Sequence, residues 1–325
     1  MIKYINNNNT QNNMYILKQI PEDFIVEEVF NTTDLKKDGK FFYYKLTKKG
    51  LNTVYTIELL KKQYNAEINF AGNKDKNAIT SQTISSNKKI LDSIINENIS
   101  LEFLGRSDEK IHLGENVGNK FIITIRNLTP QEVEYIKNKI KNKEISFINY
   151  FGSQRFGKDN LKIAKSILKR DFKTATESTD NEKVQNYIEK NPNDFNGALK
   201  QLPKKLLNLI INSYQSQVWN LCAERFKDEF IPVVGFSTEF NNSDIENYVN
   251  EILKEDGLNL RSFIIREIPN IITEGDIRKR LTIAKNIALI EKDNDELNNG
   301  MKKVKISFEL EKGSFATIFI EQLFN

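Results

Sequence analysis

Apolar residues recur at two spacings along this chain, and these spacings divide it into a mixed first part and a mainly helical second part. In the first part, alternation and short apolar runs predict strands. These predicted strands are Ile16–Glu28, Phe41–Leu46, Ile68–Ala71, Phe121–Arg126 and Ile145–Phe151. Helical spacing instead predicts a helix over Tyr55–Tyr64. The first part should therefore combine strands and helices.

Helix signals dominate the second part. Thr129-Pro130-Gln131-Glu132 is a capping box with proline at the first helical position, and it predicts a helix to about Lys143. The pattern is again helical from Asn160 to Phe226, with polar breaks near Ser178–Asn181 and at Asn191–Asn193. We therefore expect several helices joined by short polar turns.

The last third is expected to return from helices to the sheet. Asp244–Ile290 is predicted to be mainly helical, and the charged stretch Glu291–Asn299 separates it from the next element. Strict alternation over Val304–Leu310 then predicts a half-buried strand, followed by a short helix. The economical fold class is α+β. In it a mainly helical domain, residues 171–301, is inserted into a mixed-sheet domain formed by residues 1–170 and 302–325.

Composition narrows the classes of protein. The chain has 325 residues, 28% charged and 39% hydrophobic, which is typical of a folded globular protein. Cys222 and His112 are the only cysteine and histidine, so the sequence offers no Cys/His set for zinc or an iron–sulfur cluster. No apolar run approaches the ~20 residues that cross a bilayer, and the polar start lacks the apolar core of a signal peptide. We expect a cytoplasmic, metal-free protein with no membrane association.

The net charge of +4 is modest, so the distribution of lysines says more than their number. Single clusters of this kind are most simply interpreted as solvated lysine faces. They favour polyanion binding only if they converge in space. The clusters comprise Lys36, Lys37, Lys40, Lys45, Lys48 and Lys49, then Lys74 and Lys76, and then Lys137, Lys139, Lys141 and Lys143.

The segment Gly72–Gln82 places Asp75 between two lysines directly after an apolar run. Polar Thr80 and Gln82 follow at alternate positions, so the pattern predicts strand, turn and strand with a carboxylate at the tip. Loops held by a rigid scaffold often carry function. The simpler interpretation of Asp75 is a turn aspartate that caps local backbone N–H groups.

Gly152–Asp159 follows a predicted strand and precedes a helix, as a phosphate-binding Walker loop would. Asp159, however, stands where that loop needs serine or threonine to bind magnesium, and it would bring a carboxylate next to phosphates. Hydrolysis of a nucleoside triphosphate is therefore a minor alternative.

Gly72–Gln82 resembles the Gly-x-Lys-Asp-x-x-Ala-x-Thr-x-Gln signature of TruD-type tRNA pseudouridine synthases. Other segments resemble further motifs of that family in the same order, and together they extend over nearly the whole chain. They are Lys18–Glu28, Leu113-Gly114 with Gly118–Phe121, Asn149–Gly157, Ser213–Ser216 and Gly313–Thr317.

The resemblance implies a pseudouridine-synthase-like catalytic domain with an inserted, mainly helical TRUD domain. It also implies isomerisation of uridine 13 of tRNA without metal or cofactor, by a protein that we expect to be a monomer. Asp75 would be the nucleophile, attacking the sugar or the base, or first removing a sugar proton. A catalytically silent RNA-binding or RNA-folding protein on the same scaffold is the alternative.

The same resemblance implies roles for four substrate-binding residues. Lys18 would pair with Asp75 or a phosphate, Phe151 would stack on the flipped uracil, and Asn149 would hydrogen-bond the base edge or the nucleophile. Arg155 would contact phosphate. The simpler interpretations are a solvated lysine at a strand edge, a packed core phenylalanine, an asparagine that shapes a turn and an ion-paired arginine.

Overall fold

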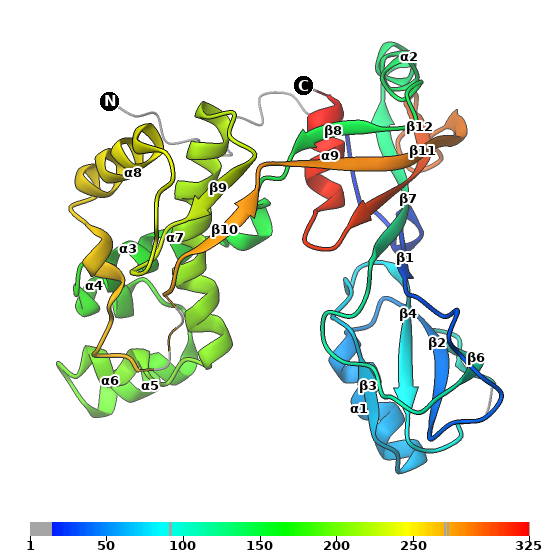
Figure 1. Cartoon of the computed structure of the whole chain (residues 1–325), viewed down its shortest axis with the longest axis horizontal. Coiled ribbons are helices and arrows are strands. Elements are labelled where there is room, and N and C mark those ends of the chain that lie inside the picture. Colours follow the sequence, from blue (N-terminus) through cyan, green and yellow to red (C-terminus); the bar gives the residue numbers. More distant parts are fainter. Residues whose placement is uncertain (1–14, 91–92, 270, 272, 325) are drawn as a thin grey trace. The chain divides into compact units, whose positions relative to one another are not determined.

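The computed structural model describes residues 15–90, 93–269, 271 and 273–324 (Figure 1). The polar start, where the absence of a signal peptide was expected, lies outside the described residues. Two compact units are present. Of the described residues, one unit contains those within 148–281, and the other contains those within 15–147 and 282–324. We call them the helical unit and the sheet unit.

A mixed sheet is the framework of the sheet unit. Its described strands lie in the order β5-β6-β2-β4-β1-β7-β12-β11-β8, and β3 pairs with β4 off this path. The strands are β1 (Phe24–Val29), β2 (Phe41–Lys49), β3 (Ile68–Phe70), β4 (Ile79–Ser86), β5 (Ser93–Asn96), β6 (Ile99–Ser107), β7 (Gly118–Leu128), β8 (Ile145–Ile148), β11 (Leu281–Asn294) and β12 (Lys302–Glu311).

Strand β1 occupies a central position because it pairs in parallel with β4 and antiparallel with β7. Ile25 lies opposite Ile79 of β4, and Glu28 lies opposite Asn119 of β7. β12 pairs with the other edge of β7, so the predicted return of the last strand to the first sheet is confirmed.

The described residues of the sheet unit also form three α-helices, α1 (Thr53–Tyr64), α2 (Pro130–Lys139) and α9 (Ala316–Leu323). The predicted capping box is present at α2, where the Thr129 side chain accepts from the Glu132 N–H and the Glu132 carboxylate accepts from the Thr129 N–H. The helix ends at Lys139 and not near Lys143 as predicted. α9 packs its Phe319 ring against Phe308 and Phe147.

The helical unit is built around the long helix α7 (Lys204–Arg225), with Trp219 and Tyr214 fully buried in its core. The Trp219 indole N–H donates to the Ile231 carbonyl of β9 at 3.1 Å. The other described α-helices and strands of this unit are α3 (Asn160–Leu168), α4 (Phe172–Glu177), α5 (Glu182–Lys190), α6 (Phe195–Leu199), α8 (Ser243–Glu255), and the two-stranded antiparallel sheet of β9 (Phe230–Val233) and β10 (Asp276–Lys279).

The prediction that Asp244–Ile290 is mainly helical is wrong beyond α8. Residues 276–279 form β10, and the long strand β11 continues through the supposed separator as far as Asn294. The cause lies in the β11–β12 pairing, which shifts register between Lys285 and Ala288. This bulge places buried Ala284 and Ile287 at a helix-like spacing, so the strict alternation of a strand is lost.

Two other predicted strands are shorter than expected. In the first segment, predicted over Ile16–Glu28, the named strand begins only at Phe24, because Pro21 begins a short 3₁₀ turn over Pro21–Asp23. Before that turn, Ile16 forms an isolated antiparallel bridge with Arg126. The segment predicted to extend to Phe151 ends as a strand at Ile148.

The compact units divide at 147/148 and 281/282, whereas the predicted domain boundaries were at 170/171 and 301/302. Helix α3 contacts α7, which places it in the helical unit. The boundaries of a catalytic and an inserted domain, as functional divisions, stay a prediction.

A buried guanidinium connects three segments of the sheet unit. Arg126 of β7 is 3% exposed, and its Nε lies 2.8 Å from Asp23 Oδ1. Its Nη1 and Nη2 lie 2.7 Å from Asp295 Oδ1 and 3.0 Å from Glu296 Oε1. Hydrogen bonds from Arg126 and Lys303 lower the pKa of Glu296 to about 2. The turn before β1 and the turn before β12 therefore depend on one side chain.

Arg126→Met should lower the free energy of unfolding by about 3–5 kcal/mol, because Asp23 and Asp295 would stay buried without their cation. Urea unfolding at neutral pH measures this change. The control is Lys292→Met, which removes an exposed lysine 3.6 Å from Glu134 and should cost less than about 1 kcal/mol. Equal costs for the two variants would contradict the prediction.

Candidate active site

Asp75 lies in the loop between the antiparallel strands β3 and β4, so the predicted strand, turn and strand are present. Its side chain is 42% exposed, and its Oδ2 lies 2.9 Å from Lys18 Nζ. No donor from the described residues is hydrogen-bonded to its Oδ1. One carboxylate oxygen is therefore paired while the group still reaches solvent.

Lys18 is placed by its backbone and by an aromatic ring. Its φ of 58° lies in the left-handed region, which is uncommon for a residue with a side chain. The ammonium group also lies 3.9 Å from the centroid of the buried Phe24 ring. This arrangement holds the lysine at the carboxylate.

The two lysines that flank Asp75 differ in environment. Lys76 is exposed, whereas Lys74 Nζ lies 2.7 Å from Glu28 Oε1 and 2.9 Å from Asn119 Oδ1. The Lys74 and Glu28 side chains are 7% and 0% exposed, so this ion pair is buried. Glu28 Oε2 also accepts the Thr83 N–H at 2.9 Å. Lys74 thus anchors the loop to β1, β4 and β7.

Buried hydroxyl and amide groups fix the main chain of the loop. The Lys74 N–H donates to Thr53 Oγ1 at 3.0 Å, and Gln82 Nε2 donates to the Gly72 carbonyl at 3.2 Å. Gln82 is 1% exposed. Gln82, one of the polar residues that alternate after Asp75, therefore supports the loop from the protein interior.

Lys48 was interpreted as part of a solvated lysine face, and that interpretation is wrong for this residue. Its side chain is 0% exposed, and Nζ donates to the carbonyl oxygens of Leu51 at 2.7 Å and Asp75 at 2.9 Å. The missed signal is the alternation on β2, where Tyr44, Leu46 and Lys48 are all buried.

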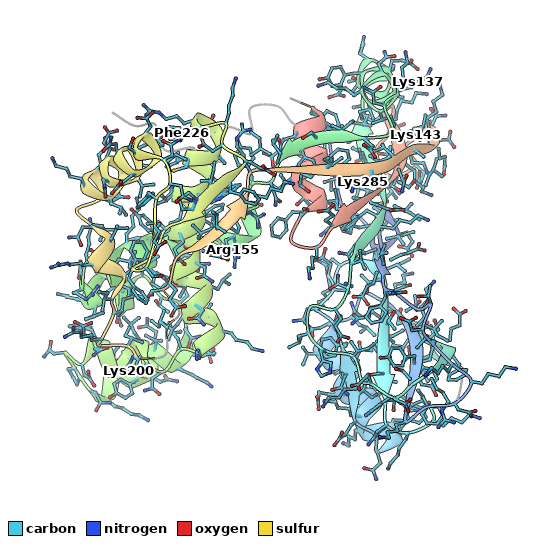
Figure 2. All side chains as sticks on the ribbon, in the orientation of Figure 1. Lys137, Lys143, Arg155, Lys200, Phe226 and Lys285 are labelled. Carbon is cyan, nitrogen blue, oxygen red and sulfur yellow. The ribbon has the colours of Figure 1, made fainter. Side chains whose placement is uncertain are left out.

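The third lysine cluster, at residues 137–143, does match the solvated interpretation. Lys139, Lys141 and Lys143 are exposed, and Lys137 pairs with Glu134 on the same helix. Figure 2 labels Lys137 and Lys143.

Asn149, Phe151 and Arg155 lie in the helical unit, whereas Lys18 and Asp75 lie in the sheet unit. The Asn149 N–H donates to the Arg280 carbonyl at 2.8 Å. Asn149 Oδ1 is buried and has no hydrogen-bond partner among the described residues. Burying an amide oxygen without a hydrogen-bond donor costs folding free energy, so Asn149 is an unusual position in this structure.

Phe151 is 7% exposed, and its ring meets Trp219 edge-on with the centroids 5.5 Å apart. The Asn220 amide holds its main chain, accepting from the Phe151 N–H at 2.9 Å and donating to its carbonyl at 3.0 Å. Phe151 is thus packed in the core, as its simpler interpretation predicted. Its stacking on a uracil base stays a prediction.

Two arginines surround the Phe151 ring, and only one of them was predicted. The guanidinium carbons of Arg278 and Arg155 lie 4.2 Å and 5.3 Å from its centroid, and Arg155 is labelled in Figure 2. Arg278 also donates to the Asn149 carbonyl from Nε and Nη2. Burial, with the charge of Arg155, lowers the pKa of Arg278 to about 10, and burial lowers the pKa of Arg155. Arg278 was missed because its strand was predicted as helix.

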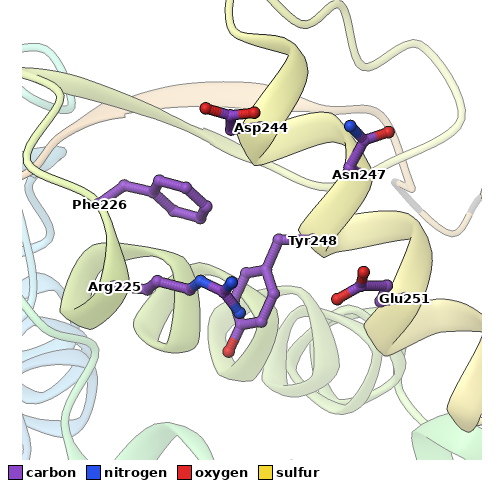
Figure 3. Close-up of a pocket in the computed structure, with 6 residues that line it drawn as sticks. All are labelled: Arg225, Phe226, Asp244, Asn247, Tyr248 and Glu251. Atoms are coloured by element: carbon purple, nitrogen blue, oxygen red, sulfur yellow. The ribbon is translucent and has the colours of Figure 1, made fainter.

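A pocket of about 230 Å³ opens elsewhere in the helical unit (Figure 3). Arg225 lies over the Tyr248 ring at 4.3 Å and lines this pocket with five other residues, Phe226, Asp244, Asn247, Tyr248 and Glu251. None of the predicted site residues lines it, so it is not the candidate active site.

Over residues 15–324, apart from the gaps given above, no group of three or more His, Cys, Asp or Glu side chains is arranged to hold a metal ion. Among the helices in the described part of the chain, none has the length and apolar character needed to cross a membrane.

These features define an α+β protein that presents a lysine-paired carboxylate on a loop anchored in its sheet. The sequence profile of the family described as tRNA pseudouridine synthase D (TruD) matches residues 4–179 and 228–323. The chain belongs to this family, and the resemblance found in its motifs is confirmed.

Individual relatives agree with this assignment. The chain is 30% identical to a protein of Methanocaldococcus jannaschii named probable tRNA pseudouridine synthase D 2, over 95% of the chain and 91% of that protein. It is 27% identical to tRNA pseudouridine synthase D of Leptospira interrogans, over 95% and 96% of the two chains. A crystal structure assigned to tRNA pseudouridine synthase D from Methanosarcina mazei superposes with a TM-score of 0.74 at 25% identity, covering 94% of this chain and 92% of that one. The predicted α+β class is confirmed.

Neighbouring glutamates on β1 provide a matched test of the loop anchor. Glu28→Gln should lower the free energy of unfolding by about 3–5 kcal/mol, because Lys74 would be left buried without its counter-charge. Glu27→Gln is the control, since Glu27 is 39% exposed, pairs with Lys120 at 3.7 Å and should cost less than about 1 kcal/mol. Chemical denaturation measures both, and a Glu28→Gln cost no larger than that of Glu27→Gln would refute the anchor.

Proposed function

We propose that this chain converts a uridine of tRNA to pseudouridine, that the target is uridine 13, and that Asp75 is the nucleophile. The observation that carries the proposal is the geometry of Asp75. Its carboxylate is half-exposed, ion-paired with Lys18 at one oxygen and mounted on a loop anchored by buried side chains. Family membership supplies the reaction class.

The reaction breaks the bond between N1 of uracil and C1′ of the ribose, rotates the base, and joins C5 to C1′. The proton on C5 is lost, and N1 gains one, so no oxidant or reductant is consumed. Asp75 can begin this sequence by attacking C1′, by attacking the base, or by removing a sugar proton. In each case Oδ1 is the oxygen without a hydrogen-bond donor from the described residues.

Lys18 would hold the Asp75 carboxylate in one orientation through Oδ2 while Oδ1 meets the substrate. A fixed orientation accelerates reactions because less freedom is lost on reaching the transition state. The exposed Lys76 next to Asp75 would contact the RNA backbone, as cations commonly do.

The base-binding side of the proposal rests on the helical unit. The target uridine must leave its stack to be reached, and Phe151 would then stack on the uracil. Asn149 would hydrogen-bond the base edge through its amide, and Arg155 would bind a phosphate. We further propose that the chain acts as a cytoplasmic monomer without metal or cofactor.

Asp75→Asn should abolish pseudouridine formation and leave tRNA affinity within a few-fold, because the amide keeps the shape of the side chain but is not a nucleophile. Purified protein is incubated with unmodified tRNA transcript without added metal, and pseudouridine is mapped chemically. Asp108→Asn, a change at an exposed position in the same unit, is the control and should remain active.

Full activity in Asp75→Asn would rule out Asp75 as the nucleophile. A wild-type protein that binds tRNA but forms no pseudouridine would instead identify a silent RNA-binding protein. Modification at a position other than uridine 13 would overturn the target alone.

Phe151→Leu should lower kcat/KM by roughly 5- to 150-fold, because base stacking on an aromatic ring contributes ~1–3 kcal/mol. Phe147→Leu is the matched control, since Phe147 is 5% exposed and packs against Phe319 at 5.2 Å. It should lower stability while leaving kcat/KM of the folded enzyme close to wild type. Single-turnover kinetics with thermal unfolding of both variants separate the two effects, and equal kcat/KM losses would refute stacking.

A further inference from the structure

Lys48 is a buried cation attached to the main chain of the candidate nucleophile. It extends from β2, its side chain is 0% exposed, and its ammonium group donates to the carbonyl oxygens of Leu51 and Asp75. Across the described residues, no carboxylate oxygen lies within 4.0 Å of its Nζ to form an ion pair. Two main-chain carbonyl groups therefore hold this charge.

Burial makes that position unfavourable for a charge. It lowers the pKa of Lys48 to about 8, with Lys74 acting in the same direction and Asp75 opposing both. Of the other charged groups around the loop, Lys18 pairs with Asp75 and Lys74 pairs with Glu28, whereas Lys76 is exposed to solvent. The positive charge on Lys48 is therefore sustained mainly by its two carbonyl acceptors and the nearby Asp75.

A purely packing role does not require an ammonium group at this position. Tyr44 and Leu46 lie on the same strand and the same buried face as Lys48. A methionine, which is of similar length, would fill the Lys48 position with an apolar side chain. The polar head nevertheless reaches Asp75 O at 2.9 Å and ties β2 to the residue that bears the carboxylate. The contact joins elements far apart in sequence at the point where the proposed chemistry begins.

We propose that Lys48 is a positioning residue for the reaction, whose ammonium group fixes the main chain of Asp75 and whose positive charge is required for full rate. The inference rests on the proposed role of Asp75. Lys48 forms and breaks no bond in the reaction, and it acts through the placement and electrostatic environment of the Asp75 carboxylate.

The test compares Lys48→Met with wild type in single-turnover assays on unmodified tRNA transcript between pH 6.5 and 9. Lys48→Met should slow the rate constant on the order of 10²-fold at neutral pH, as expected for a displaced reacting group, with tRNA affinity within a few-fold. The wild-type rate should fall as pH rises through about 8, because Lys48 then loses its proton. That fall should be absent from Lys48→Met.

The pH dependence of the free energy of unfolding tests the protonation of Lys48 independently of the reaction rate. An unfolded lysine titrates near 10.5, above the value of about 8 in the folded protein. The unfolded state therefore binds more protons between these values, so the Lys48 contribution makes wild-type stability rise with pH across this window. Lys48→Met should lack that rise in urea titrations.

Lys45→Met is the control, because Lys45 is on the same strand but on the opposite face and is partly exposed. It should retain the wild-type rate constant and the fall above pH 8. If Lys48→Met does not fold, Lys48→Gln takes its place, since the amide keeps donors without the charge. If neither folds, the wild-type pH profile decides.

The inference is overturned if the wild type is active and Lys48→Met has the same rate constant and the same pH profile. It is also overturned if the wild-type rate does not fall above pH 8. An inactive wild type would instead overturn the proposed function, and the inference with it. A slow Lys48→Met that keeps the alkaline fall would leave no role for the charge and would also refute the proposal as stated.

Discussion

The register of β1 against its two neighbours is the constraint on which the candidate site depends. Parallel pairing with β4 and antiparallel pairing with β7 place Glu28 opposite Asn119 and within reach of Lys74 and the Thr83 N–H. Because side chains alternate across a strand, a slip by one residue would exchange the buried Glu28 for the exposed Glu27. The anion that anchors the Asp75 loop would then face solvent.

The same strand also fixes the approach of Lys18. Phe24 begins β1 and lies beneath the Lys18 ammonium group, and the 3₁₀ turn before it is capped by Asp23, which also pairs with Arg126. The ion pair at Asp75 is thus supported by packing and by a buried charge network. Exposed ion pairs alone contribute little to order, so this support decides how firmly the carboxylate is held.

Local signals in the sequence were sufficient for several elements. The capping box placed the start of α2, strict alternation placed β12, and the polar residues after Asp75 placed β4. These features depend on neighbours in the sequence. The motif resemblance added what local patterns lack, because it connected Lys18 with Asp75 before any fold was known.

Features that depend on distant segments were not predictable in this way. β11 was mistaken for helix because its bulge is defined only by pairing with β12. Burial of Lys48 and Lys74 depends on carbonyl and carboxylate partners from β1 and from the loops. The contact of Phe151 with Arg278 on β10 could not be predicted either, because the strand itself was not.

Coverage of Phe151 by Arg278 has a thermodynamic consequence. The ring is only 7% exposed, and a guanidinium carbon lies 4.2 Å from its centroid. A uracil that stacks there would exchange one flat, polar-edged group for another and would bury little new apolar surface. Since burial of apolar surface is what gives binding a negative heat-capacity change, base capture at this ring should leave only a small heat-capacity signature.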